Sequence, residues 1–413
     1  MKRATQMMGR ALLGALVVVW MATAGWSQSL TWLGTLGGNY SKAWDISEEG
    51  TVVGESANAS GHPRAFRWTA SGGMQDLGTL GGYGSWAYGV SDQGSFVVGW
   101  AYTASMGYHA FRWSDSRGME DLGTLPGGCC SVAYGVNYDG FVAGRAIDAA
   151  GNWRAVLWDP YGRIRDLGTL GGTMSAALAI SPNNVVVGSA RTIFDKNHAF
   201  RWTASGGMED LGTLGGPESV AVGISTDTFV VGASDTSSSG FLDDHAFLWT
   251  ASGGMQDLGT LPGYSQSFAY DGTSLGSIVV GVAWNNASDW RAFRWTPSRG
   301  MEDLNITYAR LLTNGSVLKA ATAISFNGRY IVGFGYNAAT GREEAFLLDT
   351  QPSCTAHNGD VDSNGCVDDA DLLAVLFAFG GTGSNLGRVD VNCDGVVDDA
   401  DLLQVLFNFG SGC

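Results

Sequence analysis

The sequence predicts an all-β fold, a seven-bladed β-propeller closed by its N-terminal strand, followed by a small α-helical calcium-binding domain. Three observations lead to this prediction. A phrase of the type LGTLGG recurs seven times at intervals of 44 to 47 residues, a length that suits four short strands. Each copy also contains one phrase of the type HAFRW and one of the type VVG. Near the C-terminus, an acidic pattern typical of calcium loops appears twice.

The composition excludes several other classes of protein. Glycine accounts for 62 of the 413 residues, while 15% of residues are charged and 45% are apolar. A disordered chain would be richer in charge, collagen would show a three-residue glycine period, and a long coiled coil would be rich in Glu and Lys. The net charge of −16 argues against nucleic acid as a partner, because phosphate binding needs clustered Lys and Arg.

Residues 1–27 are predicted to be a secretory signal peptide. Basic residues precede a short apolar run, and small residues follow it. Two cleavage sites stay open, one defined by Ala22 and Ala24 and the other by Gly25 and Ser27. The alternative is an uncleaved anchor, although the run is short of the ~20 apolar residues that a spanning helix needs. We therefore expect a secreted protein, extracellular or at the cell surface, with no membrane span in the mature chain.

The repeats are predicted to fill residues 28–350. The LGTLGG-type phrase starts at Leu33, Leu77, Leu122, Leu167, Leu211, Leu258 and, in degenerate form, Leu304. The VVG-type phrase ends at Gly54, Gly99, Gly144, Gly188, Gly232, Gly281 and Gly333. Seven copies of each phrase predict seven similar structural units.

Each copy has the pattern of four short strands. In the first copy the strands are expected at 43–47, 51–55, 64–69 and 73–80, because β-branched and aromatic runs alternate with turn-forming clusters. The opening segment 29–36 matches a fourth strand, whereas the seventh copy stops after its third strand at Thr350. The opening segment can therefore complete the last blade and close the ring, which removes exposed sheet edges.

The phrases HAFRW and DLGTLGG resemble the bacterial extracellular HAF repeat, and the resemblance covers roughly residues 29–350. It implies an exported repeat protein with no assigned chemistry.

Residues that recur in every copy are expected to hold the fold. One set is Asp76, Asp121, Asp166, Asp210, Asp257 and Asp303, and another is Arg67, Arg112, Arg201 and Arg294. We expect repeated Asp–Arg or Asp–backbone hydrogen bonds between adjacent strands. The position of His109, His198 and His245 is filled by Arg64, Arg154 and Arg291 in other copies, and Arg cannot ligate a metal. With no Ser–His–Asp order, Walker loop or HExxH phrase, no catalytic residue is predicted.

Aromatic residues that do not recur are better candidates for a ligand site. The candidates are Tyr83, Trp86, Trp100, Tyr102, Trp284 and Trp290. Such rings stack on sugars or anchor a protein partner, and the alternative is ordinary packing between blades. Irregular acids, namely Glu55, Asp195, Glu218, Asp243, Asp244 and Asp289, could form a carboxylate pair for glycoside cleavage, but their spacing does not favour one.

A linker at 351–358 precedes the predicted calcium module at 359–413. Residues 354–413 hold ten Asp and one Arg, so they carry −9 of the net charge. A twelve-residue calcium loop supplies oxygen ligands from positions 1, 3, 5, 7, 9 and 12 and turns at a glycine in position 6. Two ions of Ca²⁺ are expected, held by Asp360, Asp362, Asn364, Cys366 (carbonyl), Asp368 and Asp371, and by Asp390, Asn392, Asp394, Val396 (carbonyl), Asp398 and Asp401.

An apolar helix is expected after each loop, at 372–379 and 402–409, and position twelve is Asp rather than Glu. This duplicated loop and helix resembles the type I dockerin module. The resemblance implies calcium-dependent folding and docking to a cohesin-like partner, as in polysaccharide-degrading assemblies. The pairs Asp369–Ala370 and Asp399–Ala400 depart from the Ser–Thr that dockerins usually carry as cohesin contacts, so the resemblance supports calcium more directly than it supports this partner.

Four of the six cysteines lie in or beside this module. An even number in a small exported domain predicts disulfides, and of the three possible pairings we favour Cys354–Cys413 with Cys366–Cys393. The adjacent Cys129 and Cys130 either stay reduced or form a vicinal disulfide.

The sequence therefore predicts an exported, non-catalytic protein whose propeller binds a glycan or protein ligand and whose C-terminal module binds calcium and mediates docking or surface display. The alternative is a carbohydrate-active enzyme, a glycoside hydrolase or lyase, and a third option is a purely structural surface protein. A carboxylate pair about 5–10 Å apart in one funnel would favour the enzyme.

Overall fold

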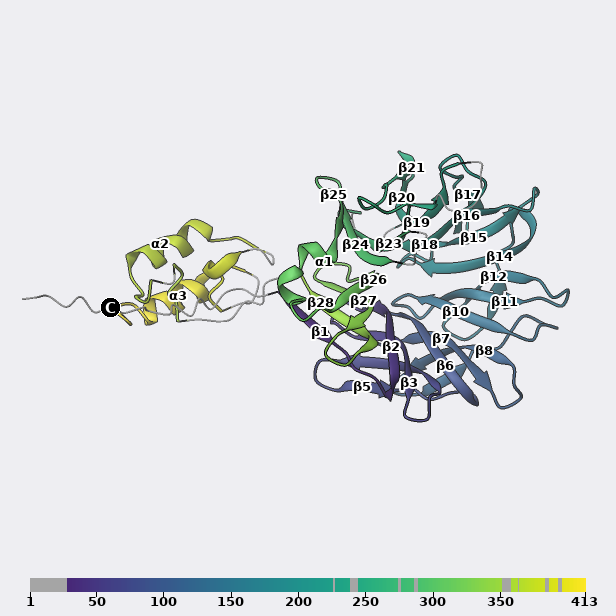
Figure 1. Cartoon of the computed structure of the whole chain (residues 1–413), viewed down its shortest axis with the longest axis horizontal. Helices are drawn as coiled ribbons and strands as arrows, with labels where there is room; N and C mark the ends of the chain where they lie inside the picture. The colour runs from purple at the N-terminus through teal and green to yellow at the C-terminus, as the bar shows by residue number, and fades with distance from the viewer. Residues whose placement is uncertain are drawn as a thin grey trace, which may run out of the picture. The chain divides into compact units, whose positions relative to one another are not determined.

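The computed structural model describes residues 28–225, 227–237, 244–273, 276–285, 289–350, 358–362, 364–382, 386–392 and 396–413. The predicted signal peptide and residues 351–357 of the predicted linker lie outside these ranges. The chain divides into two units, one from Gln28 to Gln351 and the other containing the C-terminal residues from Pro352 (Figure 1). Each unit is described separately below.

The larger unit is almost entirely β-structure. Five of its sheets have four antiparallel strands in chain order. These sheets are β6 (Gly81–Val90), β7 (Val97–Thr103), β8 (Tyr108–Ser114) and β9 (Gly118–Asp121); β10 (Ser131–Val136), β11 (Val142–Ile147), β12 (Trp153–Trp158) and β13 (Ile164–Asp166); β14 (Gly171–Ile180), β15 (Val186–Thr192), β16 (Asn197–Thr203) and β17 (Gly207–Asp210); β18 (Ser219–Ile224), β19 (Phe229–Asp235), β20 (Asp244–Thr250) and β21 (Gly254–Asp257); and β22 (Gln266–Gly272), β23 (Val279–Trp284), β24 (Trp290–Thr296) and β25 (Gly300–Asp303).

The sixth sheet has eight strands and joins the two ends of the repeat region. Its order is β26 (Val317–Ile324), β27 (Tyr330–Asn337), β28 (Arg342–Asp349), β2 (Gly37–Ile46), β3 (Val52–Asn58), β4 (Pro63–Thr69) and β5 (Gly73–Asp76), and β1 (Ser29–Trp32) also pairs with β28. β1 is antiparallel to β28, with Ser29 opposite Asp349, whereas a single parallel bridge from Tyr40 to Glu343 joins β2 to β28. The predicted pairing of the first strand with the last is therefore confirmed.

Consecutive sheets contact one another in chain order, and β26 and β28 contact β2, so the sheets form a closed ring (Figure 1). This is the arrangement of a β-propeller. The predicted strands are present, although β2 begins earlier than expected and β5 ends earlier.

The glycine of the VVG phrase lies inside a strand, where the neighbouring backbone approaches it closely. A Cβ atom at Gly54 would lie 1.9 Å from the carbonyl oxygen of Lys42. The pairing of β2 with β3 is irregular at this point, between Ala43 and Asp45. Glycine is therefore required because no side chain fits between the two strands.

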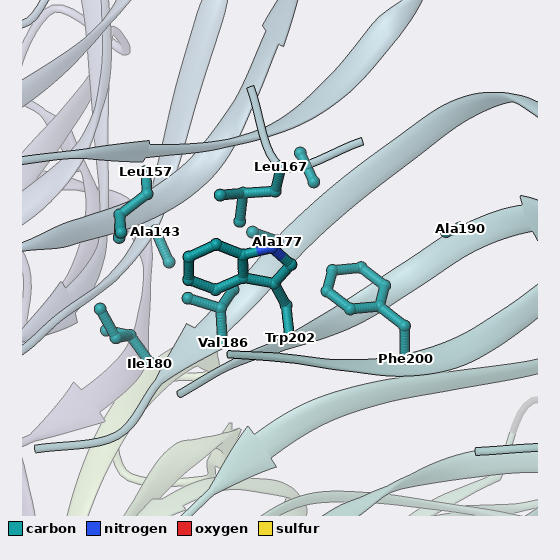
Figure 2. Close-up of a cluster of buried hydrophobic side chains, with 10 residues drawn as sticks. Ala143, Leu157, Leu167, Ala177, Ile180, Val186, Ala190, Phe200 and Trp202 are labelled. Atoms are coloured by element: carbon teal, nitrogen blue, oxygen red, sulfur yellow. The ribbon is translucent and has the colours of Figure 1, made fainter. Parts of the chain in front are cut away.

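The hydrophobic core lies between neighbouring sheets. In one cluster, Leu157 of β12 packs with Ile180 of β14 and with Phe200 and Trp202 of β16 (Figure 2). The Phe and Trp of the HAFRW phrase thus fill the space between two sheets, which explains why they recur. Removing a side chain such as Phe200, which is completely buried, costs about 3–5 kcal/mol in typical cores.

A buried serine joins each of five pairs of neighbouring sheets, and a sixth, Ser41, joins β2 to β28 within the eight-stranded sheet. Ser175 accepts a 2.8 Å hydrogen bond from the Ala155 N–H of the preceding sheet and donates a 2.6 Å bond to the Gly168 carbonyl. The equivalent residues make the same two bonds: Ser41, Ser85, Ser131, Ser219 and Ser267. Between β25 and β26 the helix α1 (Leu304–Thr307), followed by the 3₁₀ turn η1 (Ala309–Leu311), replaces this contact, and Asn305 bonds to both the N–H and the carbonyl of Leu318.

The smaller unit contains α2 (Asp369–Ala378), the 3₁₀ turn η2 (Gly387–Val389) and α3 (Asp399–Phe407). The two helices expected from the sequence are therefore confirmed. The halves are joined crosswise, because Val367 of the first loop exchanges backbone hydrogen bonds with Gly410 and Ser411 after α3, and Val397 of the second loop with Gly380 and Gly381 after α2. Five valines form the shared core: Val367, Val375, Val391, Val397 and Val405.

Candidate functional site

Two cross-strand pairs vary from sheet to sheet within an otherwise uniform repeat. In the first pair, the second-named residue comes directly after the VVG glycine: Lys42–Glu55, Trp86–Trp100, Val132–Arg145, Ala176–Ser189, Val220–Ala233, Phe268–Val282 and Ala320–Phe334. In the second pair, the first-named residue lies three positions after the VVG glycine: Ala57–Pro63, Tyr102–Tyr108, Ile147–Trp153, Arg191–Asn197, Asp235–Asp244, Trp284–Trp290 and Tyr336–Glu343. Residues two apart in a strand share one face of the sheet. These residues together are called the variable face.

Four of the six aromatic residues predicted from the sequence meet on the variable face and beside it. The rings of Trp86 and Trp100 stack with centroids 4.1 Å apart, and those of Tyr83 and Tyr102 stack at 4.2 Å. Trp100 contacts Tyr102 edge-on at 5.3 Å and so joins the two stacks. The group continues through Tyr108, which lies 5.1 Å from Trp100.

The other two predicted residues, Trp284 and Trp290, lie on β23 and β24 with ring centroids 6.4 Å apart. Trp284 packs in a cluster with Phe334 and Trp44. Trp44 lies 6.0 Å from Tyr88, and the Tyr88 hydroxyl accepts a 3.3 Å hydrogen bond from the Trp100 indole.

All six predicted residues thus belong to one continuous aromatic arc, made up of Trp290, Trp284, Phe334, Trp44, Tyr88, Trp100, Trp86, Tyr102, Tyr83 and Tyr108. Its outer members are accessible, since Tyr83 is 54% exposed and Trp290 is 39% exposed. The rings also pack on one another, which is the alternative that the sequence left open: even the exposed Tyr83 stacks on Tyr102.

Two glutamates beside the arc have pKa values displaced in opposite directions. Glu55 is 9% exposed, and burial raises its pKa to about 7 despite the nearby charge of Lys42 and a hydrogen bond from the Trp86 indole. Burial acts on Glu343 as well, but hydrogen bonds from Lys319 (2.9 Å) and the charge of Lys42 (3.3 Å) hold its pKa below the usual value. The two carboxyls share Lys42, and their protonation states differ near neutral pH.

The recurring Asp residues pair with the first residue of the HAFRW phrase. The Asp121 carboxylate lies 2.8 Å from His109 Nδ1, and Asp166 accepts a 3.0 Å bond from Arg154. The Asp–backbone bond that forms is local rather than between adjacent strands, as from the Gly123 N–H to Asp121 at 2.8 Å. The expectation that Arg67, Arg112, Arg201 and Arg294 pair with these Asp residues was wrong, because their ion pairs are with Asp115, Glu120, Glu209 and Glu302. His and Arg alternate because either one can donate a hydrogen bond to the Asp carboxylate.

A central cavity of about 190 Å³ is lined by the first strand of every repeat and by four carboxyls that sequence reasoning missed, those of Asp45, Glu48, Asp92 and Asp271. Asp45 and Asp271 occupy a repeat position that elsewhere contains Gly89, Gly135, Ala179, Gly223 or Ala323. Asp45 accepts a 2.8 Å bond from the Val90 N–H, and Asp271 a 3.0 Å bond from the Ile324 N–H. Burial raises the pKa of Asp271 to about 7, and burial together with the Asp271 charge raises the pKa of Asp45 well above its usual value. The departure from Gly or Ala was the signal that could have found Asp45 and Asp271.

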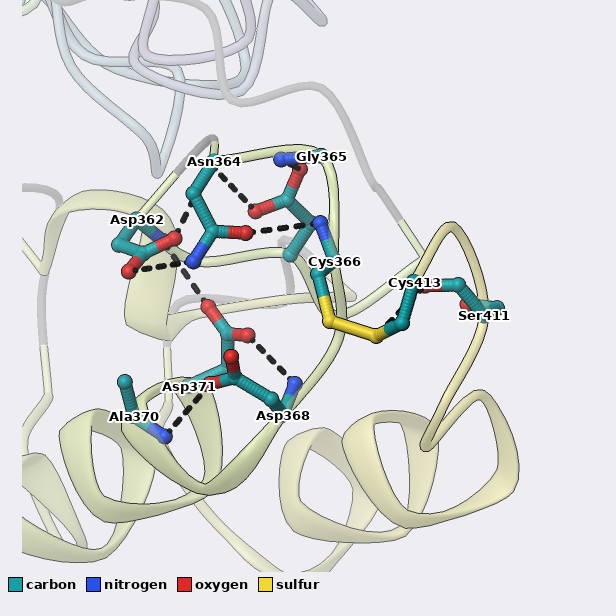
Figure 3. Close-up of a disulfide and its surroundings, with 10 residues drawn as sticks. Asp362, Asn364, Gly365, Cys366, Asp368, Ala370, Asp371, Ser411 and Cys413 are labelled. Atoms are coloured by element: carbon teal, nitrogen blue, oxygen red, sulfur yellow. Dashed lines mark hydrogen bonds between the residues drawn. A yellow bond between two sulfur atoms is a disulfide. The ribbon is translucent and has the colours of Figure 1, made fainter.

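The first predicted calcium loop gathers its carboxylates. Asp360, Asp362 and Asp371 present oxygen atoms that all lie within 4.8 Å of one another. Asp371 is completely buried and accepts hydrogen bonds from the backbone N–H groups of Val361 (2.6 Å), Asp362 (3.0 Å) and Asp368 (2.9 Å), while Asp368 caps α2 (Figure 3). A set of hard oxygen donors of this kind fits a Ca²⁺ ion.

The second loop repeats this construction. Asp401 is completely buried and accepts bonds from the N–H groups of Val391 (2.6 Å), Asn392 (3.0 Å) and Asp398 (3.0 Å), and Asp398 caps α3. Asp394, another predicted ligand, lies outside the described residues.

The predicted disulfide pairing was wrong. Cys366 is bonded to Cys413, with Cα atoms 4.7 Å apart (Figure 3). The backbone bonds of Val367 to Gly410 and Ser411 bring the end of the chain to the first loop, which the sequence alone did not reveal. Cys354 and Cys393 lie outside the described residues, and Cys129 and Cys130 are free thiols.

In the part of the chain that the structure describes, no helix has the length and apolar character needed to cross a membrane.

No family model and no curated protein matches the chain. Among solved structures, it is similar to the β-propeller domain of the Trilobed protease from Pyrococcus furiosus (9% identity, TM-score 0.48), with 76% of this chain and 96% of that chain covered. It is also similar to acylaminoacyl peptidase from Pyrococcus horikoshii (9%, 0.43, covering 74% and 51%) and to TolB from Acinetobacter baumannii (11%, 0.38, covering 63% and 65%). Likeness at this level identifies no family, and the description of the fold rests on the strand pairing.

Proposed function

We propose that this chain is an exported, non-catalytic glycan-binding protein, in which a seven-bladed propeller of HAF-like repeats presents the aromatic arc to a glycan. A dockerin-like module would bind two calcium ions and mediate docking or display at the cell surface. The observation that carries the proposal is the continuous aromatic arc on the variable face and beside it.

Seven blades follow if the eight-stranded sheet is divided at its weakest point. Only the bridge from Tyr40 to Glu343 joins β2 to β28. Division there gives one four-stranded unit of β2 to β5 and another of β26, β27, β28 and β1. With the five separate sheets this makes seven units, the number of repeat copies in the sequence.

The geometry of the arc favours a glycan over a protein ligand. Sugar rings offer apolar C–H faces that stack on aromatic rings and hydroxyls that need hydrogen bonds. The arc combines exposed rings such as Tyr83 with polar groups nearby, including Lys42 and Glu343. A protein anchor would use a buried pocket for one ring rather than an extended row of rings.

A glycan array followed by calorimetry of the best ligand tests this proposal. Tyr83→Ala and Trp100→Ala should each weaken binding about tenfold, because each variant removes one aromatic ring on which a sugar would stack. Tyr161→Ala is the matched control, because Tyr161 is 85% exposed and outside the arc. Absence of any bound glycan, or equal loss in the Tyr161→Ala variant, would contradict the proposal.

The calcium function rests on the two loops and is tested separately. Calorimetry should find two Ca²⁺ ions per chain, and Asp362→Ala should reduce this to one by removing an exposed ligand of the first loop. Two sites retained in that variant would overturn the assignment of Asp362.

A docking role is supported by apolar side chains that the two helices expose at equivalent places. Phe377 of α2 is 88% exposed and Phe407 of α3 is 84% exposed. Leu373 and Leu403 form a second such pair. A cohesin domain is the partner to test, and a Phe377→Ser, Phe407→Ser variant should lose its binding; no binding by the unmodified chain would reject a cohesin-like partner.

A glycoside hydrolase is the second candidate, and Glu55 with Glu343 is the observation in its favour. One protonated and one ionised carboxyl beside an aromatic surface is the combination that glycoside cleavage uses. Product analysis on any bound glycan decides between the candidates. Release of sugar by the unmodified chain and not by Glu55→Gln would establish hydrolysis and overturn the non-catalytic proposal.

A further inference from the structure

A cavity of about 450 Å³ opens on the variable face of the sheets that begin with β14, β18 and β22. Its volume lies in the range of small-molecule binding sites, about 300–1,000 Å³. Its walls include Ser189, Ala233 and Phe268, which belong to the variable pairs.

Gln266 lines this cavity with an unused hydrogen-bonding group. The residue is 4% exposed, and no described residue forms a hydrogen bond with its side-chain amide. Its amide atoms are not fully enclosed and reach the open space of the cavity, where a ligand or water can form hydrogen bonds with them. Gln266 points to a bound molecule with hydroxyl or amino groups.

The charge of the lining indicates a cationic ligand. Glu218, Asp235 and Asp244 contribute three carboxyl groups to the cavity, and its described lining residues include no Lys, Arg or His. Their oxygens are not gathered for a metal ion, because among the described residues only Asp360, Asp362 and Asp371 bring three ligand atoms within 4.8 Å. Carboxyls spread around a cavity suit an organic cation better than a metal ion.

The cavity also continues the aromatic arc. The ring of Phe268 lies 4.8 Å from that of Tyr270, and both pack in the cluster that contains Trp284 of the arc. Gln266 itself is the cross-strand partner of Trp284. A glycan lying along the arc can therefore place one sugar residue in the cavity.

We propose that this cavity binds an amino-sugar residue, with its protonated amino group among Glu218, Asp235 and Asp244, its hydroxyls at Gln266 and its ring on Phe268. This inference rests on the proposed glycan-binding function and adds to it the class of glycan. Charge-assisted hydrogen bonds to an ammonium group are stronger than neutral ones, so the charged sugar should be preferred over its acetylated form.

Calorimetry with two matched ligands tests the inference on the full chain. The tetramer of glucosamine carries protonated amino groups, and the tetramer of N-acetylglucosamine does not. We expect the glucosamine tetramer to bind about tenfold more tightly, with a preference that falls as salt is added. In Glu218→Gln the preference should disappear, while Glu209→Gln, at an exposed residue of β17 outside the cavity, should retain it.

Gln266→Leu separates a ligand contact from a structural role. Because it replaces an amide that bonds to no described residue by an apolar group of similar size, the variant should fold about as stably as the unmodified chain and bind the glucosamine tetramer about tenfold less tightly. Equal binding of both tetramers, or a preference unchanged by Glu218→Gln and Gln266→Leu, would overturn this inference alone if Trp100→Ala still weakens binding. If neither tetramer nor any array glycan binds, the proposed function fails with it.

Discussion

Replacing Asp271 by Ala should change how the stability of the ring depends on pH. Ala is a residue that the repeat already uses at this position, at Ala179 and Ala323. Burial raises the pKa of Asp271 from 3.8 to about 7, and each pKa unit corresponds to about 1.4 kcal/mol. The free energy of unfolding is therefore about 4 kcal/mol lower at a pH above 7, where this carboxyl is ionised in the folded state, than at a pH below 3.8.

The sign follows from the raised pKa. Between pH 3.8 and about 7 the folded chain holds a proton that the unfolded chain releases, so stability falls as pH rises through this window. About 3 kcal/mol of the loss lies between pH 5 and pH 8. Asp271→Ala removes this dependence, but it also removes the acceptor for the N–H groups of Gly272 and Ile324. The variant should therefore be less stable than the unmodified chain at pH 5, and the difference should shrink or reverse by pH 8.

Denaturant unfolding followed by tryptophan fluorescence measures this effect in the repeat region of the mature chain alone, because the 13 tryptophans that follow residue 27 all precede residue 296. Asp139→Ala, at an exposed turn, is the control and should leave the pH dependence unchanged. Parallel pH profiles for Asp271→Ala and the unmodified chain would refute the reasoning, since they would mean that Asp271 is ionised at ordinary pH in the folded state.

Three further outcomes are expected. Ser175→Ala should lower the free energy of unfolding by about 1–3 kcal/mol, because it leaves the Ala155 N–H and the Gly168 carbonyl buried and unpaired; no change in denaturant midpoint would contradict this. Cys413→Ser should open the bond to Cys366 and lower the thermal stability of the C-terminal unit, detected by calorimetry, and an unaltered transition would show that the bond adds nothing. Excess EDTA should lower the calorimetric transition of the C-terminal unit and leave the tryptophan-detected transition in place, whereas an unaffected C-terminal unit would argue against calcium as its structural ion.

The repeat architecture could be read from the sequence because its signals recur. Turn clusters, the glycine of VVG and the Phe and Trp of HAFRW appear in each unit at nearly constant spacing, and each proves to fill a fixed place in a sheet or between sheets. Closure by the first strand was also predictable, since one strand was missing at one end and present at the other.

Contacts between residues distant in sequence could not be read in the same way. Neither the meeting of Glu55 with Glu343 nor the pairing of Cys366 with Cys413 leaves a local pattern, because each depends on how separate segments approach. The six aromatic candidates could be recognised by residue type. Their connection through Trp44 and Tyr88 could not, because it depends on how the sheets curve around the propeller.

Hydrogen–deuterium exchange with and without a bound glycan tests the central claim most directly. If the aromatic arc is the binding surface, the glycan should protect peptides that contain the connection from β7 to β8 and the start of β6. The turns between third and fourth strands, such as 69–73, lie at the opposite end of the strands and should exchange as before. Protection confined to those turns, or none at a saturating glycan concentration, would contradict the claim.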